Sequence, residues 1–514
     1  MRNIKPSILF AICAWSLLIL RFGYRYGTGD QVELLPYTLF LHNPSLYPHD
    51  FFIQGLHAAI PNERTVMATL LLPFINHLEI FCFIFQFLAT IFLVLGLERL
   101  ALRYIHNKYL AWLAVLIALI PLNDFALGNV EAYSECLQAS GVAVAIVVWA
   151  INFFLDRKFM LASALISIAT FIQVLDGLDV MMVLCAIMLF MFIVKQVPLK
   201  TVLGFMGIYA LTAGVFLIFV LYKKSAAALP GCTPASHADL FKILFAFRHP
   251  HHFIFSSFPK IKMGVYFMLT LFALIFFAEH SSKTFEFVLA GSIGLIIYAF
   301  AVDDFQNIFI GNFQFYKITI WIKFLGVIAA VGLAEELYLS NISLPAMLKI
   351  EKGGLLALIL VCWIIIFKFN QLLPYQVPFQ IFGLKEKDDM IAICQQIKET
   401  TPANAVFIQP FDNTELKFYA QRSSFVEFKA NVRHTCYVNE WYRRMQLVYG
   451  ISAVDAAKGF ALQQKADDNY YTENLWKFNN HSGYGITHML VKKEYKPPFG
   501  TLILSNNSYA VYKL

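Results

Sequence analysis

The sequence predicts a polytopic α-helical membrane protein with a small C-terminal α/β domain outside the membrane. The composition is 59% hydrophobic and 14% charged, with 51 phenylalanines, which is far from the balance of a soluble domain. Apolar runs of about 17–25 residues, long enough to cross hydrocarbon as a helix, recur along the first three quarters of the chain. Basic residues alternate between the connections in the way that membrane topology requires.

We place about eleven membrane spans by this length criterion. They are 6–22, 79–98, 109–122, 136–155, 159–175, 180–195, 201–222, 263–279, 286–302, 317–338 and 354–372. The first run follows Arg2 and Lys5, as the apolar part of a signal peptide would. No small-residue cleavage site follows it, so we interpret it as a retained helix.

The orientation follows from the basic residues of the short connections. With the N-terminus in the cytoplasm, the internal connections carry Arg99/Arg103/Lys108, Arg157/Lys158, Lys195/Lys200, Lys283 and Lys349/Lys352. The short external connections 123–135, 176–179 and 303–316 carry no Lys or Arg. The net charge of +7 is therefore a topology signal, without the basic stripe of a nucleic-acid-binding protein. An odd number of spans places the C-terminal domain on the outer side of a bacterial inner membrane.

Two parts are expected: a membrane module at 1–375 and an extracytoplasmic α/β domain at 385–514. The module has a long first external loop at 23–78, with amphipathic stretches suited to interfacial helices at 51–60 and 64–76, and a second large external loop at 223–262. Within the domain we expect helices at 388–400, 437–449 and 452–466, and strands at 405–409, 424–428, 488–492 and 501–514. Cys232, Cys394 and Cys436 would be external, and one disulfide among them stays open.

Five clusters of acidic and histidine residues fall in external loops. They are Asp30/Glu33, Asp124 with Glu131/Glu135, Asp176/Asp179, His249/His251/His252 and Asp303/Asp304. Ionisable groups at a bilayer boundary are costly, so their location on one side suggests a common purpose.

Asp30 and Glu33 follow the first span in a glycine-containing segment. A carboxylate near the hydrocarbon edge is partly desolvated, which raises its pKa and suits a general base. A helix-capping acid is the equally weighted alternative. Asp50 is the weaker candidate because its position before the amphipathic stretch fits an N-cap.

For the acids of the next two external connections, a structural role is favoured over a functional one. Glu131 and Glu135, four residues apart, would share a helix face and repel unless a cation lies between them, and a solvated helix end is slightly favoured. Asp176-Gly-Leu-Asp179 reads as an Asp-Gly turn in preference to a metal site.

Cationic groups suited to a phosphate occur in the later external loops. Arg248-His249-Pro-His251-His252 joins a bidentate guanidinium to imidazoles, in a loop whose lysines break the positive-inside bias. The alternatives to phosphate binding are metal binding by the histidines and simple anchoring at the membrane interface. Lys317 opens the tenth span, where snorkelling explains it, whereas Lys323 lies about 9 Å deeper and needs a partner or a cavity. In the external domain the conspicuous charged and aromatic residues are Arg422, Lys429, Glu440, Trp441, Arg443 and Arg444.

The pattern resembles the GT-C superfamily of polytopic glycosyltransferases, and more closely a bacterial branch of GT-C-like membrane proteins. The residues that carry the resemblance are Gly29-Asp30, Leu35-Pro36-Tyr37, Tyr47-Pro-His-Asp50-Phe51, Arg248-His-Pro-His-His-Phe253, Thr401–Ile408, Arg422 and Glu440-Trp-Tyr-Arg443. It implies a catalytic acid in the first loop, here Asp30 and then Glu33, and donor-phosphate recognition by Arg248, the adjacent histidines and Lys317. The Asp-x-x-Glu spacing departs from the adjacent or once-separated acids of many such enzymes.

We therefore expect a glycosyltransferase that moves a sugar from a polyprenyl-phosphate donor to an envelope glycan, lipid or protein acceptor on the external face. Further cavity candidates are Asp50, Glu131, Glu135, Asp303, Asp304 and Lys323. No metal site is predicted, and dependence on a divalent cation and the oligomeric state stay open. The alternative is a transporter, flippase or scaffold of envelope polysaccharide assembly without transfer chemistry.

Overall fold

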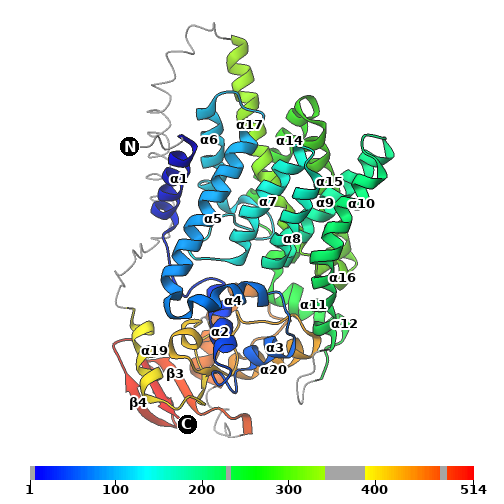
Figure 1. Ribbon diagram of the computed structural model, residues 1–514. Helices are drawn as coiled ribbons and strands as arrows, with labels where there is room; N and C mark the ends of the chain where they lie inside the picture. Colours follow the sequence, from blue (N-terminus) through cyan, green and yellow to red (C-terminus); the bar gives the residue numbers. More distant parts are fainter. Residues whose placement is uncertain (1–5, 227–232, 342–387, 412, 475–482) are drawn as a thin grey trace. The chain divides into compact units, whose positions relative to one another are not determined.

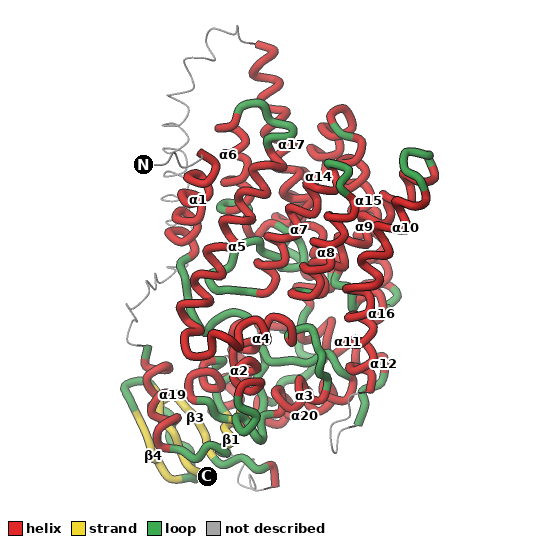
Figure 2. Tube along the Cα trace, in the orientation of Figure 1, coloured by secondary structure: helices red, strands yellow, loops and turns green. Residues whose placement is uncertain are grey.

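The computed structural model describes residues 6–226, 233–341, 388–411, 413–474 and 483–514 of the 514-residue chain (Figure 1). The described part is mostly helical, and all of its strands come from the C-terminal residues (Figure 2). The predicted span 354–372 lies outside the described residues.

The chain forms two compact units, each assembled from three segments. Unit 1 takes its described residues from Met1–Tyr24, Phe83–Phe216 and His251–Phe379. Unit 2 takes its described residues from Arg25–Cys82, Leu217–Pro250 and Gln380–Leu514. Unit 2 thus combines most of the first predicted external loop and part of the second with the C-terminal residues.

Unit 1 is built from apolar helices. They are α1 (Pro6–Phe22), most of α5 (Leu78–Ala101), α6 (Lys108–Leu119), α7 (Ala139–Leu155), α8 (Phe159–Ile172), α9 (Val174–Ile193), α10 (Leu199–Tyr209), α14 (Lys260–His280), α15 (Ser282–Ala299), α16 (Ile308–Gly311) and α17 (Thr319–Asn341). Short 3-10 helices lie at η2 (Asn123–Phe125), η5 (Phe255–Ser257) and η7 (Phe315–Ile318), and π-helical segments η3 (Ala210–Gly214) and η6 (Phe300–Asp304) continue α10 and α15. Small residues allow close packing: a Cβ on Gly326 of α17 would lie 2.5 Å from the Leu269 carbonyl oxygen of α14.

Within the described residues, six helical segments are long and apolar enough to cross a membrane. They are Thr65–Ala101, Val174–Ile193, Leu199–Ser225, Lys260–His280, Ser282–Asp304 and Ile308–Leu337. Shorter apolar helices at Pro6–Phe22, Lys108–Leu119, Ala139–Leu155 and Phe159–Ile172 coincide with the other predicted spans up to residue 341. The prediction of a mostly helical chain with several helices long and apolar enough to cross a membrane is therefore confirmed.

The prediction of a turn at Asp176-Gly-Leu-Asp179 is wrong. The chain reverses at Gln173, whose φ/ψ of −143°/106° separates α8 from α9, and both aspartates lie in the first turns of α9. Gly177 packs against α8, where an added Cβ would lie 2.2 Å from the Thr170 hydroxyl oxygen. This glycine therefore serves helix packing instead of a turn.

Unit 2 begins with helices of the first predicted external loop. They are α2 (Gln31–His42), α3 (Phe51–Ala58), α4 (Thr65–Leu71) and η1 (Leu72–His77). The amphipathic stretches at 51–60 and 64–76 are helical as predicted, and α3 buries Phe52, Ile53 and Leu56. The sequence did not predict α2, which carries Pro36 in its interior.

The remaining helical elements of unit 2 come from the second loop and the C-terminal residues. They are α12 (His237–Leu240), η4 (Phe241–Arg248), α19 (Asp389–Thr400), η8 (Leu416–Ala420), α20 (Thr435–Tyr449), η9 (Gly459–Leu462), α21 (Gln463–Asn469) and η10 (Tyr470–Asn474). Two short helices bridge the unit boundaries, α11 (Val215–Ala226) and α13 (Pro250–Phe253). The helix predicted at 452–466 is wrong over its first seven residues, because a short 3-10 helix begins at Gly459 and α-helix only at Gln463.

A mixed five-stranded sheet organises the C-terminal part of unit 2. Its strands are β1 (Val406–Ile408), β2 (Ser423–Ser424), β3 (His488–Lys492), β4 (Thr501–Ser505) and β5 (Tyr509–Lys513), in the order β2-β1-β3-β5-β4. β1 pairs in parallel with β2 and β3, and β5 pairs antiparallel with β3 and β4. The predicted strand 424–428 is reduced to the two residues of β2.

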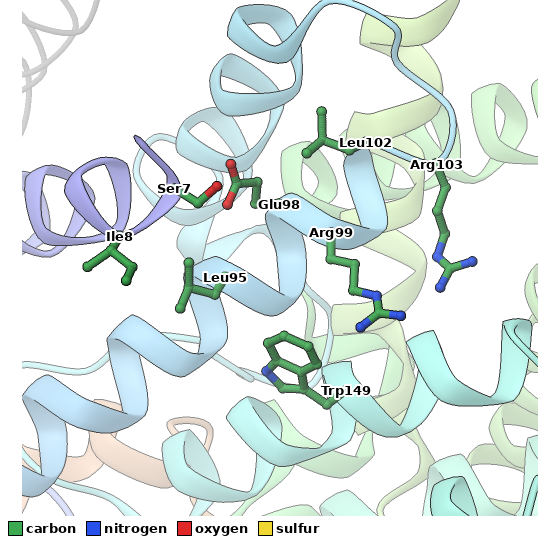
Figure 3. Close-up of a pocket in the computed structure, with 8 residues that line it drawn as sticks. All are labelled: Ser7, Ile8, Leu95, Glu98, Arg99, Leu102, Arg103 and Trp149. Atoms are coloured by element: carbon green, nitrogen blue, oxygen red, sulfur yellow. The ribbon is translucent and has the colours of Figure 1, made fainter. Parts of the chain in front are cut away.

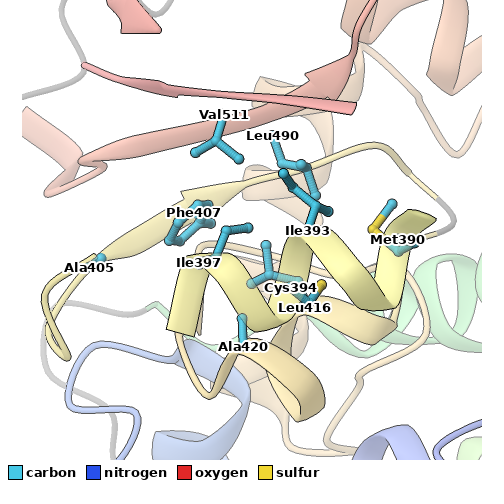
Figure 4. Packing of buried hydrophobic residues seen from close by; sticks show 10 residues of the cluster. All are labelled: Met390, Ile393, Cys394, Ile397, Ala405, Phe407, Leu416, Ala420, Leu490 and Val511. Atoms are coloured by element: carbon cyan, nitrogen blue, oxygen red, sulfur yellow. The ribbon is translucent and has the colours of Figure 1, made fainter. Parts of the chain in front are cut away.

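One helix closes the apolar face of this sheet. Ile393 and Ile397 of α19 are fully buried against Phe407 of β1 and Leu490 of β3, with Leu416 and Ala420 of η8 completing the cluster (Figure 4). The four-residue spacing of the two isoleucines places them on one helix face. This packing fixes the position of η8, which carries Lys417.

Cys436 of α20 forms a disulfide, whereas the buried Cys394 of α19 is a free thiol. The backbone around Cys436 contacts the second predicted loop: Ala235 N donates to Thr435 O at 3.2 Å, and the Asn439 amide donates to Thr233 O at 2.9 Å. Of the cysteines predicted to be external, Cys232 lies outside the described residues, Cys436 is in a disulfide and Cys394 is free.

Candidate functional site

Asp30 lies at the N-terminus of α2, at the end of a glycine-containing turn. Gly27 and Gly29 adopt positive φ angles of 76° and 56°, which glycine tolerates without strain. A Cβ on Gly27 would lie only 2.6 Å from the Tyr419 hydroxyl oxygen, and that hydroxyl donates to Tyr26 O at 2.9 Å. The turn is thus fixed against η8, and this contact positions Asp30 at the start of the helix.

The Asp30 carboxylate faces a lysine of the C-terminal residues. Lys429 Nζ lies 3.7 Å from Asp30 Oδ1, and the two side chains are 24% and 59% exposed. Asp30 occupies the capping position of α2, but its side chain makes no capping hydrogen bond. The carboxylate is therefore held near a cation while it stays open to solvent.

Glu33, the second predicted catalytic acid, is buried one turn further along α2. It forms an ion pair with Arg64, which also contacts Glu63 at 3.1 Å. Burial opposes the charge on Arg64, but Glu33 and Glu63 raise the pKa of this guanidinium above its usual value. Burial likewise opposes the charge on Glu63, yet Lys224 and Arg64 lower the pKa of this carboxyl to about 2. Glu33 is thus a structural ion-pair partner.

Arg248 ends the π-helix η4 and is almost completely buried. Its Nε donates to Phe428 O at 2.7 Å, and its NH2 nitrogen donates to Lys429 O at 3.1 Å. The guanidinium lies 4.2 Å from the Phe428 ring centroid. Burial lowers the pKa of Arg248 to about 10, an effect that Glu33 opposes. Arg248 therefore fixes the backbone of Lys429, the residue that faces Asp30.

We call Asp30, Glu33, Arg64, Arg248 and Lys429 the Asp30 cluster. Lys224 and Arg433 act electrostatically on Glu63 beside it. Together these groups comprise three carboxylates and five cations. An excess of positive charge suits an anionic ligand and disfavours a metal cation.

A second charged group lies in the core of unit 2. Lys417 Nζ contacts Asp50 Oδ1 at 3.2 Å and Glu427 Oε2 at 3.0 Å, and all three side chains are at most 1% exposed. Asp50 also caps α3 by accepting from Ile53 N at 3.0 Å and accepts from Ser424 N at 2.8 Å. The predicted capping role of Asp50 is confirmed, and the same carboxylate joins the first loop to the C-terminal residues.

The three predicted histidines are divided by the unit boundary, which falls between Pro250 and His251. His249 Nδ1 lies 3.4 Å from an Arg248 nitrogen within unit 2. In unit 1, the His252 ring bonds to Gly128 O at 2.6 Å, and the rings of His251 and His252 lie 4.2 Å apart.

Lys317, predicted to bind the donor phosphate, belongs to unit 1 and forms an ion pair there. Its Nζ lies 2.9 Å from Asp176 Oδ2, and the two side chains are 14% and 2% exposed. Asp179, one turn further along α9, is 1% exposed, and neither of its buried oxygens has a hydrogen-bond partner among the described residues. Lys317 and Asp176 are its electrostatic neighbours. Two carboxylates thus share one lysine near the start of α9.

The remaining candidates of unit 1 lie in its connections and at helix ends. Burial and the neighbouring Asp124 raise the pKa of Glu131 to about 7, against Lys262 and Lys323. Lys323 is fully buried and donates to Leu122 O at 2.8 Å and Asn123 O at 3.0 Å, so it binds carbonyls that follow α6. Glu135, which also acts on Glu131, is partly buried.

The two acids that end η6, Asp303 and Asp304, differ in their surroundings. Both Asp303 oxygens accept from Phe255 N, at 3.0 and 3.3 Å, whereas Asp304 is exposed. Asp303 thus orders the short segment before α14.

The structure brings Asp30, Glu33 and Arg248 into one cluster of unit 2, and it places Lys317, Lys323, Glu131, Asp303 and Asp304 in unit 1. Sequence reasoning did not single out Arg64, Lys417 or Glu427. Lys417 had a local signal, because it interrupts the apolar run Leu416–Ala420, whereas Arg64 only preceded an amphipathic stretch.

Residues 388–448 match a family model described as a domain of unknown function (DUF6798). The matched segment contains Lys417, Glu427 and Lys429 and runs from α19 into α20. No curated protein matches the chain.

Proposed function

We propose that the protein is a membrane glycosyltransferase that moves a sugar from a polyprenyl-phosphate donor to an envelope glycan, lipid or protein acceptor. The observation that supports it most is the pairing of an exposed carboxylate, Asp30, with Lys429 in a cluster with excess positive charge. Inverting sugar transfer needs a base for the acceptor hydroxyl and cations near the departing phosphate. The likeness to GT-C enzymes on the quoted motifs agrees with this assignment.

Asp30 is the base in this proposal. Its carboxylate is 59% exposed, whereas Glu33 is buried and neutralised by Arg64. The carboxylate takes the proton of the acceptor hydroxyl, whose oxygen bonds to the anomeric carbon as the bond from that carbon to the phosphate oxygen breaks. The bonding electrons leave with the polyprenyl phosphate, and the configuration at the anomeric carbon inverts.

Lys429 stabilises the departing phosphate, and Arg248 acts through it. The Arg248 guanidinium is committed to the carbonyls of Phe428 and Lys429, so it positions the lysine. An ion pair with both side chains partly exposed is worth no more than about 1 kcal/mol, so a phosphate dianion can replace Asp30 as the partner of Lys429.

The test compares three variants of the full chain in membranes supplied with radiolabelled polyprenyl-phosphate sugars. Asp30→Asn should lower transfer by about 100-fold or more, as expected for loss of a general base. Glu494→Gln, an exposed acid of unit 2, controls for the change of charge. Lys429→Gln should mainly lower kcat, because the lysine stabilises the charge that develops on the departing phosphate. Full activity in Asp30→Asn would overturn the proposed mechanism.

A transporter or flippase is the second candidate, and Asp179 favours it. A buried carboxylate without a hydrogen-bond partner in a helix long enough to cross a membrane is typical of ion or proton pathways. Purified protein that moved a lipid-linked glycan across vesicles, lost this activity in Asp179→Asn and never transferred sugar would favour this function over the first.

A further inference from the structure

We propose that unit 1 carries a binding site for an anionic phospholipid between α1, α5 and α7. A cavity of about 450 Å³ opens there, and its lining includes Arg99, Arg103, Ile8, Leu102 and Trp149 (Figure 3). The site lies at the ends of α5 and α7 that the basic residues predict to be cytoplasmic. It is independent of the proposed transferase site, which belongs to unit 2.

The polar part of the lining comprises Ser7, Glu98 and two guanidinium groups that share one acid, Asp156. Arg99 lies 2.7 Å from one oxygen of Asp156, and Arg103 lies 2.6 Å from the other. Arg103 also donates twice to Asn152, to its side-chain and backbone oxygens at 3.1 Å. Arg103 is thereby fixed in position as part of the wall.

Arg99 is the group that can take a ligand. Its side chain is 40% exposed. The bond to Asp156 uses one donor, whereas a guanidinium offers five in a planar fork that matches phosphate oxygens. The cation lies 5.7 Å from the Trp149 ring centroid and 5.4 Å from that of Phe153, which holds the fork beside the cavity (Figure 3).

The rest of the lining is apolar and suits an acyl chain. Ile8 of α1 and Leu102, just beyond α5, are 41% and 43% exposed, and Leu95 of α5 also lines the cavity. Trp149 donates through its indole nitrogen to Phe92 O at 3.0 Å. Tryptophan is enriched where hydrocarbon meets headgroups, so this cavity has an apolar part and a phosphate-binding part at the depth of a headgroup.

The surrounding charge selects an anionic headgroup over a zwitterionic one. The nearby cations are Arg99, Arg103, Arg157, Lys158 and Lys283, and the nearby acids are Glu98, Asp156 and Glu286. Glu98 is 4% exposed and accepts from the Trp112 indole nitrogen at 2.6 Å. Basic pockets between membrane helices on the cytoplasmic side are known to bind anionic headgroups.

The test measures lipid adducts of the detergent-purified full chain by native mass spectrometry, with phosphatidylglycerol and phosphatidylcholine of equal chain length. Wild-type protein should retain phosphatidylglycerol in preference to phosphatidylcholine. Arg99→Gln should weaken phosphatidylglycerol binding by about tenfold, the effect of losing one charge-assisted contact. Lys200→Gln removes the same charge from an exposed residue outside the cavity and should bind like the wild type.

A second variant separates loss of the site from loss of folding. Ile8→Trp keeps both arginines and places a larger side chain at a residue that is 41% exposed, so it should obstruct the acyl groove and weaken phosphatidylglycerol binding. Equal retention of the two lipids by the wild type would overturn the proposal. Unchanged binding in both Arg99→Gln and Ile8→Trp would also overturn it.

Discussion

Replacing Lys417 with methionine should destabilise unit 2 strongly, because it leaves two buried carboxylates without their shared cation. Lys417 is 1% exposed and contacts Asp50 at 3.2 Å and Glu427 at 3.0 Å. Although burial opposes its charge, the two acids raise the pKa of Lys417 above its usual value. Removing one partner of a buried ion pair costs about 3–5 kcal/mol, and methionine preserves most of the side-chain volume.

The assay is hydrogen exchange of the full-length protein, followed by mass spectrometry of peptides that cover η8 and the segment 423–428. Lys417→Met should accelerate exchange there by about 100-fold or more, which corresponds to about 3 kcal/mol of lost local stability. The matched control is Lys465→Met, which removes an ion pair with Asp455 in which the lysine is 49% exposed and should cost at most about 1 kcal/mol.

A triple variant with Lys417→Met, Asp50→Asn and Glu427→Gln should recover part of the loss, since it removes the uncompensated charges. An effect of Lys417→Met no larger than that of Lys465→Met would refute the view that this buried triad stabilises unit 2. An unrecovered triple variant would show that the cost is one of packing instead of charge.

Three further predictions concern unit 2. The pKa of Glu63 is lowered to about 2 in the folded chain. The ionised carboxylate should therefore add to the free energy of unfolding above about pH 4.5, and this contribution should be lost as the pH falls towards 2. It is at most about 3 kcal/mol, and solvent screening lowers it because the side chain is 29% exposed. When unfolding is measured at a series of pH values, the loss of stability on acidification should therefore be smaller in Glu63→Gln than in the wild type. An equal loss in the two proteins would contradict the lowered pKa of Glu63. Gly27→Ala should lower the free energy of unfolding by about 1–2 kcal/mol, measured by thermal unfolding. Alanine is strained at φ 76°, and its Cβ would lie 2.6 Å from the Tyr419 hydroxyl oxygen. The control is Gly483→Ala, because a Cβ there has open space around it. Peptide mapping without reductant should recover Cys436 in a disulfide. Cys232 is the expected partner because Thr233 and Ala235 hydrogen-bond beside Cys436. A disulfide that forms in the membrane-inserted protein requires an oxidising compartment, so a reduced Cys436 would contradict the external placement of the domain.

Local patterns predicted the helices and strands well wherever periodicity was strong. The alternation of Met390, Ile393 and Ile397 marked α19, and the turn at Ser505–Asn507 separated β4 from β5. Prediction failed where tertiary packing overrides local signals. Proline is unfavourable inside a helix and no helix was predicted at 31–42, yet α2 forms around Pro36 with Leu34, Leu35 and Tyr37 buried.

The candidate site was only partly readable from the sequence. Asp30 and Arg248 were chosen correctly as members of one neighbourhood, because loops on the same side of a membrane can converge. Their partners Lys429 and Arg64 are separated from Asp30 by long stretches of chain, and no local pattern pairs residues at such distances. Lys417 and Glu427 were missed for the same reason.

The most direct test of the transferase account is an experimental structure of the full chain with a polyprenyl monophosphate bound. We expect phosphate density within contact of Lys429, with the Asp30 carboxylate facing the same space and the Glu33–Arg64 pair intact. Lipid phosphate bound away from Lys429, or an Asp30 carboxylate turned to a separate surface, would contradict it.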